Sequence, residues 1–237
     1  MERNQGSFKQ FVRDYWSYYR ELEDDFLTTR KYVSFVPANY PTFSIEYLKL
    51  YQAVCSEIDV LGKSMAYAVN HNFKPNGKRN NIFKWWLEVQ DSYCVSSEQG
   101  VSYIGKRPTS KLSEAVCLFL GAAEIRPWDS FRTESYVASN GSVRVRSVNN
   151  STPSWWSSYN KVKHNRISLA IHEDEEPNYS KANLGNLIYA LSALYLLEKA
   201  YMEAVGTQED IESFFDQSRL FARSVYATSG DIDELFN

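Results

Sequence analysis

The pattern of apolar and polar positions predicts a mainly helical protein. Apolar residues recur at three- and four-residue steps over residues 8–30 and again over residues 44–65, with charged residues on the opposite faces. Pro37 and Pro41 interrupt the chain between these stretches, and Ser44 stands where an N-cap residue is favoured. The two stretches therefore predict long helices that pack as an antiparallel pair.

Later stretches also carry helical signals. A short helix is expected near residues 82–90, after a loop rich in Asn, Gly, Lys and Pro, and a second apolar run predicts a helix over residues 113–120. The most apolar stretch, residues 184–197, predicts the central core helix, and Glu198 begins the return of charge at its end. A last helix is expected over residues 211–225.

Two segments have the pattern of β-hairpins. Residues 93–95 and 101–104 flank a polar turn and could pair. Asn140-Gly141 is a stronger turn signal, because this dipeptide favours the positive backbone angles of a tight hairpin. The expected fold class is mainly α: a helical bundle with long antiparallel helices and one or two small β-hairpin insertions.

Length and composition refine this expectation. A chain of 237 residues can bury a sizeable core, so we expect a single elaborated domain over residues 1–237, with residues 91–150 as an insertion that carries short strands. No run approaches the roughly 18 consecutive apolar residues of a transmembrane helix, and the first residues lack an apolar signal core. The expected location is cytoplasmic, with no membrane partner.

Cysteine and histidine spacing offers no familiar metal site. The chain has 3 cysteines, widely spaced and without a Cys-x-x-Cys pair, which favours neither a disulfide framework nor a zinc site. A Gly-rich phosphate loop is also missing from the sequence. We therefore expect no metal and no cofactor.

Charge is distributed unevenly along the chain. A net charge of −3 gives no overall attraction to nucleic acid, so a binding surface would need local clustering. Residues 135–172 contain no Asp or Glu, and a strand after the Asn-Gly turn would place two of their cations on one face. That hairpin would be a basic arm leading into the next helix, or a solvated edge protected by charge. The cations of this stretch are Arg144, Arg146, Lys161, Lys163 and Arg166.

A second basic stretch, residues 70–87, contains Trp85 and Trp86. Aromatic rings beside cations could stack nucleic-acid bases. Tryptophan pairs also serve as core or interface anchors, and we expect that role here.

The most informative window is residues 155–166, Trp-Trp-Ser-Ser-Tyr-Asn-Lys-Val-Lys-His-Asn-Arg, which is predicted to be one helix. Asn160 lies four residues before His164, so the two side chains should share a helical face. Lys161 lies three residues before the histidine, and Lys163 and Arg166 flank that face. An imidazole among cations suits phosphate chemistry, because it can move a proton while the cations hold phosphoryl oxygens.

This window resembles the signature of the HEPN superfamily, small helical domains in which an Arg-Asn-x-x-x-His helix often forms a metal-independent ribonuclease site across a homodimer. Asn160 and His164 match the polar residue and the histidine of that signature. Tyr159 occupies the position of the arginine and cannot supply a permanent cation. Lys161, Lys163 or Arg166 could replace the charge, although each leaves a helix in a different direction from residue 159.

The resemblance implies an RNA-directed protein that acts as a homodimer and that could be a metal-independent endoribonuclease of a bacterial toxin–antitoxin or phage-defence system. The implied catalytic residues are His164, Asn160 and Lys161. The implied RNA-binding residues are Lys163, Arg166, Arg144, Arg146 and Tyr159.

Two other readings of the same residues stay open. Trp156, Tyr159 and Val162 could face a core, with His164 capping or bridging helices, which would make the window structural. Alternatively, the missing arginine marks a degenerate HEPN-like module that acts as a scaffold through protein partners.

Overall fold

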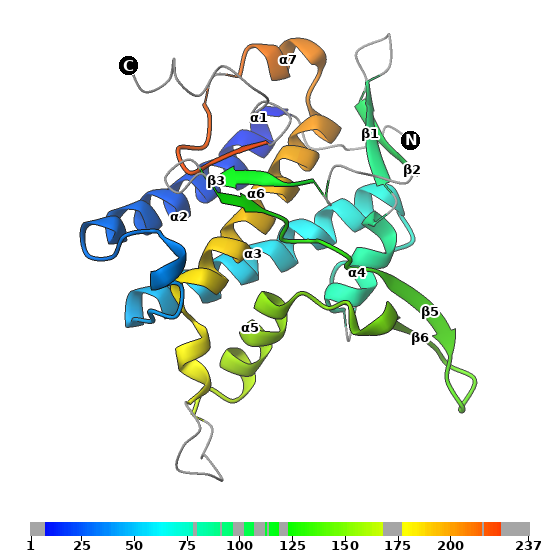
Figure 1. Cartoon of the computed structure of the whole chain (residues 1–237). Coiled ribbons are helices and arrows are strands. Elements are labelled where there is room, and N and C mark those ends of the chain that lie inside the picture. The colour runs from blue at the N-terminus through cyan, green and yellow to red at the C-terminus, as the bar shows by residue number, and fades with distance from the viewer. Residues whose placement is uncertain are drawn as a thin grey trace.

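A computed structural model of the chain describes residues 8–77, 80–90, 92–96, 102–106, 112, 114–118, 123–167, 177–214 and 216–223. The protein is mainly helical, with small antiparallel sheets (Figure 1). None of the helices in these ranges is long and apolar enough to cross a membrane.

Three long helical segments dominate the fold. The first is continuous from residue 8 to residue 28 and contains a π-helical turn between two α-helical parts. The segments are α1 (Phe8–Phe11), η1 (Val12–Trp16) and α2 (Ser17–Thr28), then α3 (Ile45–Val69), then α6 (Leu184–Val205). Shorter helices are η2 (Thr29–Lys31), η3 (Pro37–Asn39), α4 (Ile82–Val89), η4 (Val148–Asn150), α5 (Ser154–His164), η5 (Asn178–Lys181) and α7 (Gln208–Glu212).

The predicted helix starts are confirmed at α3 and α6. The Ser44 hydroxyl accepts a hydrogen bond from the Tyr47 N–H, and the Asn183 side chain accepts one from the Asn186 N–H. A β-bridge joins Phe43 to Asn183 just before the two helices, so α3 and α6 start side by side and run in the same general direction (Figure 1). The two helices that the sequence predicts to pack as an antiparallel pair correspond to α2 and α3.

Stacked tryptophans form the centre of the core. Trp85 and Trp86 of α4 are both buried, which confirms their expected role as core anchors. The Trp86 ring stacks on Trp128, with ring centroids 4.6 Å apart, and Trp128 meets Trp155 of α5 edge to face at 5.1 Å. A Cβ on Gly62 of α3 would lie 2.6 Å from the Trp85 ring, so glycine permits the close approach of α3 and α4.

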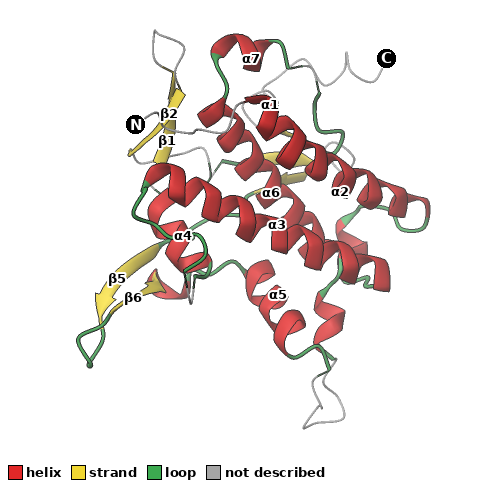
Figure 2. Ribbon diagram, turned by 180° about the vertical axis from the view of Figure 1, so that it is seen from behind, coloured by secondary structure: helices red, strands yellow, loops and turns green. Residues whose placement is uncertain are grey.

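In the described ranges, seven short strands form three separate sheets. The hairpin predicted for residues 93–95 and 101–104 is confirmed, and so is the one at Asn140-Gly141, where Gly141 has a φ of 76°. Both views place the second hairpin beside α4 and away from α2 (Figure 1, Figure 2). The sheets are β1 (Ser92–Ser96) with β2 (Ser102–Lys106), β4 (Ala123–Ile125) with β3 (Val116–Leu118) and β7 (Phe221–Arg223), and β5 (Thr133–Val137) with β6 (Val143–Ser147).

Two predicted helices are wrong. Residues 116–118, expected to be helical, form strand β3, and the helix expected over residues 211–225 ends with α7 at Glu212, after which residues 221–223 form β7. A short apolar run fits a buried strand as well as a helix, so its periodicity cannot decide between them. The decision is tertiary, because β3 pairs with a strand from the other end of the chain.

A buried carboxylate attaches that C-terminal strand to the helices. Glu23 of α2 is fully buried and accepts hydrogen bonds from the backbone N–H groups of Arg219 and Leu220, at 3.1 and 3.2 Å. The hydroxyls of Tyr19 and Ser218 also hydrogen-bond to it. Together with the Arg20 guanidinium, these partners hydrogen-bond both oxygens of the carboxylate, so its charge is not buried unpaired.

Candidate functional site

The candidate site is the C-terminal end of α5, which the core holds firmly in place. Trp155, Trp156, Tyr159 and Val162 are buried along one side of the helix. The indole N–H of Trp155 donates to the carbonyl of Pro127 at 2.9 Å. The helix is therefore rigidly anchored by its first two turns, and its last turn lies at the surface.

The helix is shorter than predicted. It ends at His164, and Asn165 has the non-helical angles φ −147° and ψ 60°. The expectation that residues 155–166 form one helix is therefore wrong at its end, and Arg166 does not flank a helical face. Two local features accompany this end: basic side chains in the last turn suit the negative end of the helix dipole, and Asn165 leaves the helix easily.

The end of α5 nevertheless gathers an exposed basic cluster, which consists of Lys161, Lys163, His164 and Arg166. Within the ranges that the structure describes, no carboxylate forms an ion pair with any member of this cluster. Asn160, one turn before His164, is half-buried. The cluster can therefore bind an anion without first breaking an ion pair with a described residue.

Tyr159 lies in the core beneath this cluster. Its side chain is 6% exposed, and its ring packs against Trp156 and Tyr51. Burial, with a smaller contribution from Cys55, raises the pKa of Tyr159 to about 12. The Lys163 ammonium lies 5.5 Å from the centre of its ring, a cation–π distance. Tyr159 thus supports Lys163 from below and offers no surface to RNA in this conformation.

The two hairpin arginines are placed apart from the basic cluster. The hairpin and η4 lead into the first turn of α5, which has 11 residues, so its first residue lies about 15 Å along the helix axis from His164. Arg146 forms an ion pair with Glu134 at 2.9 Å and lies over the Tyr136 ring. Arg144 is exposed. The structure therefore does not join Arg144 and Arg146 to His164 in one compact site.

The second basic stretch borders a small cleft. Lys74 and Lys84 line a cavity of about 380 Å³ between the 70–80 loop, α4 and the inner face of β6. The amide of Asn80 donates to the Lys74 carbonyl and holds the loop in shape. With Trp85 and Trp86 buried, this cleft has cations but no tryptophan face for a base.

Sequence reasoning missed the most unusual polar residue. Glu198, expected to return charge to the end of the core helix, is fully buried, and neither of its carboxylate oxygens has a hydrogen-bond partner within the described ranges. Burial raises its pKa well above 4.5, and the charge of Glu57 raises it further. The sequence contains a signal for this burial. Leu191, Leu194 and Tyr195 lie seven, four and three positions before Glu198, which places the carboxylate on the apolar face of the helix.

The described ranges contain no group of three or more His, Cys, Asp or Glu residues gathered to hold a metal. Comparison of the chain with protein-family models, with curated proteins and with solved structures finds no match. The functional argument therefore rests on the residues themselves.

Proposed function

We propose that this chain is an RNA-directed, HEPN-like helical protein whose basic cluster at the end of α5 binds RNA phosphates. The observation that carries the proposal is the joint exposure of Lys161, Lys163 and His164 in the last turn of α5, which the core anchors, and of Arg166 just beyond it. Cations that are free of carboxylate partners keep their full attraction for a polyanion. A rigid helix also fixes their relative positions, which lowers the entropic cost of binding.

His164 is the residue that would perform chemistry. In the reaction that the HEPN resemblance implies, the RNA 2′-hydroxyl attacks the adjacent phosphorus and the bond to the 5′-oxygen breaks. The imidazole would move a proton, and a neighbouring lysine would stabilise the extra negative charge. The products would be a 2′,3′-cyclic phosphate and a 5′-hydroxyl, and no metal takes part. Asn160 would orient the phosphate or the imidazole, and the resemblance implies that two copies bring their α5 ends together.

One observation favours the alternative, a HEPN-like module that binds without cleaving. The arginine position of the family signature is occupied by Tyr159, which is buried. Replacement of the cation by a core residue removes a charge from the reacting phosphate, while the surrounding lysines still permit binding. In that case the chain acts as an RNA-binding or scaffold subunit.

The first experiment incubates the purified protein with mixed cellular RNA in the presence of a chelator, together with the His164→Ala variant. His71→Ala is the matched control, because His71 is an exposed histidine in a loop elsewhere. Cleavage that yields cyclic phosphates, persists in His71→Ala and disappears in His164→Ala would establish the ribonuclease. Cleavage that survives in His164→Ala would reject the catalytic role.

Binding is tested separately, by titrating a labelled single-stranded RNA at several salt concentrations. Three phosphate contacts predict a slope of log affinity against log salt of about −2, and Lys163→Ala should make it shallower by about 0.7. Lys31→Ala, at an exposed lysine outside the cluster, should leave the slope unchanged. Intact RNA together with affinity that neither salt nor Lys163→Ala alters would overturn the proposed function.

A further inference from the structure

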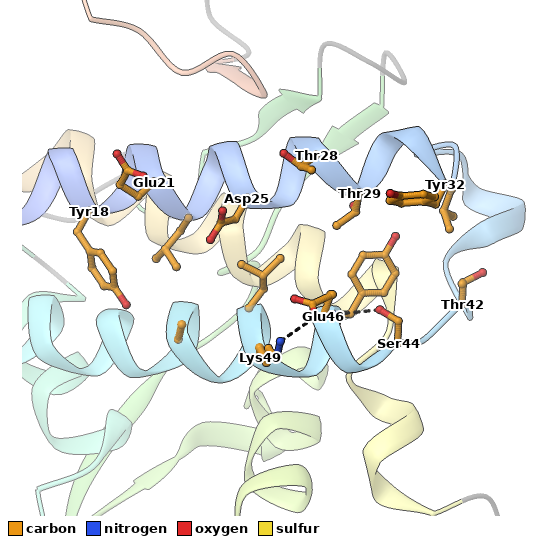
Figure 3. Close-up of a pocket in the computed structure, with 15 residues that line it drawn as sticks. Tyr18, Glu21, Asp25, Thr28, Thr29, Tyr32, Thr42, Ser44, Glu46 and Lys49 are labelled. Carbon is orange, nitrogen blue, oxygen red and sulfur yellow. Dashed lines mark hydrogen bonds and ion pairs between the residues drawn. The ribbon is translucent and has the colours of Figure 1, made fainter.

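A groove lies between α2 and α3, and none of its lining residues belongs to the basic cluster at the end of α5. It has a volume of about 800 Å³. Leu22, Val33, Leu50 and Ala53 contribute apolar surface to it. Figure 3 shows Tyr18 at one end and Tyr32 near the other, with Tyr18 and Asp25 directed from α2 toward α3. A groove of this kind offers aromatic and aliphatic anchoring surface to a partner.

The dimensions favour an elongated occupant. The α2 residues that line the groove run from Tyr18 to Thr28, which spans about 15 Å at the rise of an α-helix. Two antiparallel helices with an apolar trough between them are the usual receptor for a third amphipathic helix, which inserts side chains at positions i, i+3 or i+4 and i+7. The trough is long enough for about three turns of such a helix.

The charge of the rim decides what that helix carries. Glu21, Asp25 and Glu46 line the groove, and Lys49 is the single lining cation. Lys49 is already paired with Glu46, at 2.7 Å. Glu21 and Asp25 are exposed and have no ion pair with any other described residue. The rim therefore attracts cations and repels a polyanion, so RNA is the wrong occupant.

The floor of the groove contains an unsatisfied polar group. Tyr47 lines the groove, is 1% exposed, and its hydroxyl has no hydrogen-bond partner in the part of the chain that the structure describes. A buried hydroxyl without a partner is costly. Because this hydroxyl is itself buried, the surface that an occupant meets is formed by the neighbouring side chains, and the docking argument rests on shape and charge.

We propose that the α2–α3 groove docks a basic amphipathic helix of a partner protein, with its apolar stripe against Leu50 and Ala53 and its Lys or Arg residues beside Glu21 and Asp25. A second copy of this chain fits poorly. Two acidic rims would repel each other in a symmetric dimer. The basic helix of the chain itself, α5, has its apolar side buried in its own core.

The test uses a synthetic helical peptide of about 14 residues, with Leu at i, i+3, i+4 and i+7 and Lys on the other face. A peptide of the same composition in scrambled order measures non-specific attraction to an acidic protein. Binding to the full-length protein is followed by fluorescence anisotropy. We expect saturable binding of the amphipathic peptide, weaker by about tenfold or more for the scrambled one.

Variants assign the binding to the groove. Asp25→Lys reverses an exposed rim charge and should weaken peptide binding about tenfold, while Asp129→Lys, an exposed charge reversal outside the groove, should weaken it much less. Ala53→Trp fills the trough and should abolish binding. Circular dichroism checks that each variant is folded. If Ala53→Trp does not fold, Asp25→Lys alone tests the assignment to the groove.

A photo-crosslinker placed at Thr28, which lines the groove and is exposed, then identifies the natural contact. A crosslinked segment that is basic and amphipathic supports the proposal. Equal binding of the scrambled peptide, equal effects of Asp25→Lys and Asp129→Lys, or crosslinks to RNA would overturn it. Self-association that Ala53→Trp abolishes would also overturn it, in favour of a second copy. These results are independent of the RNA experiments.

Discussion

At the scale of single residues, hydrogen bonding distinguishes two buried carboxylates that look alike in the sequence. Glu23 is buried among donors, whereas Glu198 is buried with neither oxygen hydrogen-bonded to any part of the chain that the structure describes. An isolated ionised carboxylate in a core is very costly, so the group remains protonated over a wider pH range than usual. Glu198 therefore lowers stability whenever it is forced to ionise.

The Glu198→Gln substitution should make the free energy of unfolding less sensitive to a rise in pH above 4.5. The folded state holds a proton that the unfolded chain releases above the ordinary pKa of 4.5, so stability of the wild type falls as pH rises from that value toward the raised pKa of Glu198. The slope is about 1.4 kcal/mol per pH unit inside this window. Urea denaturation from pH 4 to pH 9 should show the variant gaining on the wild type as pH rises. Glu21→Gln, at an exposed carboxylate, should show no such gain, and a variant curve parallel to the wild type would contradict the assignment.

At the scale of elements, the long helices and the two hairpins were predictable, whereas the short strands β3 and β7 were not. The starts of α3 and α6 follow from Ser44 and from the apolar stripe of residues 184–197, because local capping and periodicity act within one element. Strands β3 and β7 depend on each other and on Glu23, which binds the chain just before β7. The residues around each strand in the sequence do not indicate that β3 pairs with β7.

The Glu23→Ala substitution should release β7 from α2. It removes one acceptor from the buried Tyr19 hydroxyl and from two backbone N–H groups, and it removes the carboxylate that pairs with Arg20, at a cost of about 3 kcal/mol or more. Hydrogen exchange should accelerate in β3 and β7 before the long helices. Asp24→Ala is the matched control, since it removes only the exposed ion pair with Arg219 and should cost less than about 1 kcal/mol. Equal losses in the two variants would show that Glu23 has no special role.

At the scale of the whole molecule, the net charge is only −3, yet two surfaces carry charge of opposite sign. The basic cluster lies at the end of α5, and the acidic groove lies between α2 and α3. Segregated charges of this kind direct different ligands to different faces. Under the proposed function, RNA and a cationic protein helix would bind at separate sites.

Each surface should therefore respond only to its own substitutions. Asp25→Lys should weaken binding of the basic peptide about tenfold and leave RNA affinity within about twofold, whereas Lys163→Ala should do the reverse. The two ligands are titrated separately, because a cationic peptide would itself bind RNA. A common loss in both assays would indicate that the variants disturb the fold or that the surfaces are one site.

The sequence by itself determined the main helices, the two hairpins and the candidate residues at the end of α5, because periodicity, caps and the Asn-Gly turn act over a few neighbouring positions. Only the tertiary structure decided that Tyr159 and Glu198 are buried, that Arg166 lies beyond the helix, and that β3 pairs with β7. It also created the acidic groove, whose walls come from two helices. Burial and long-range pairing depend on which surfaces meet, and residue spacing within a segment does not specify its partner.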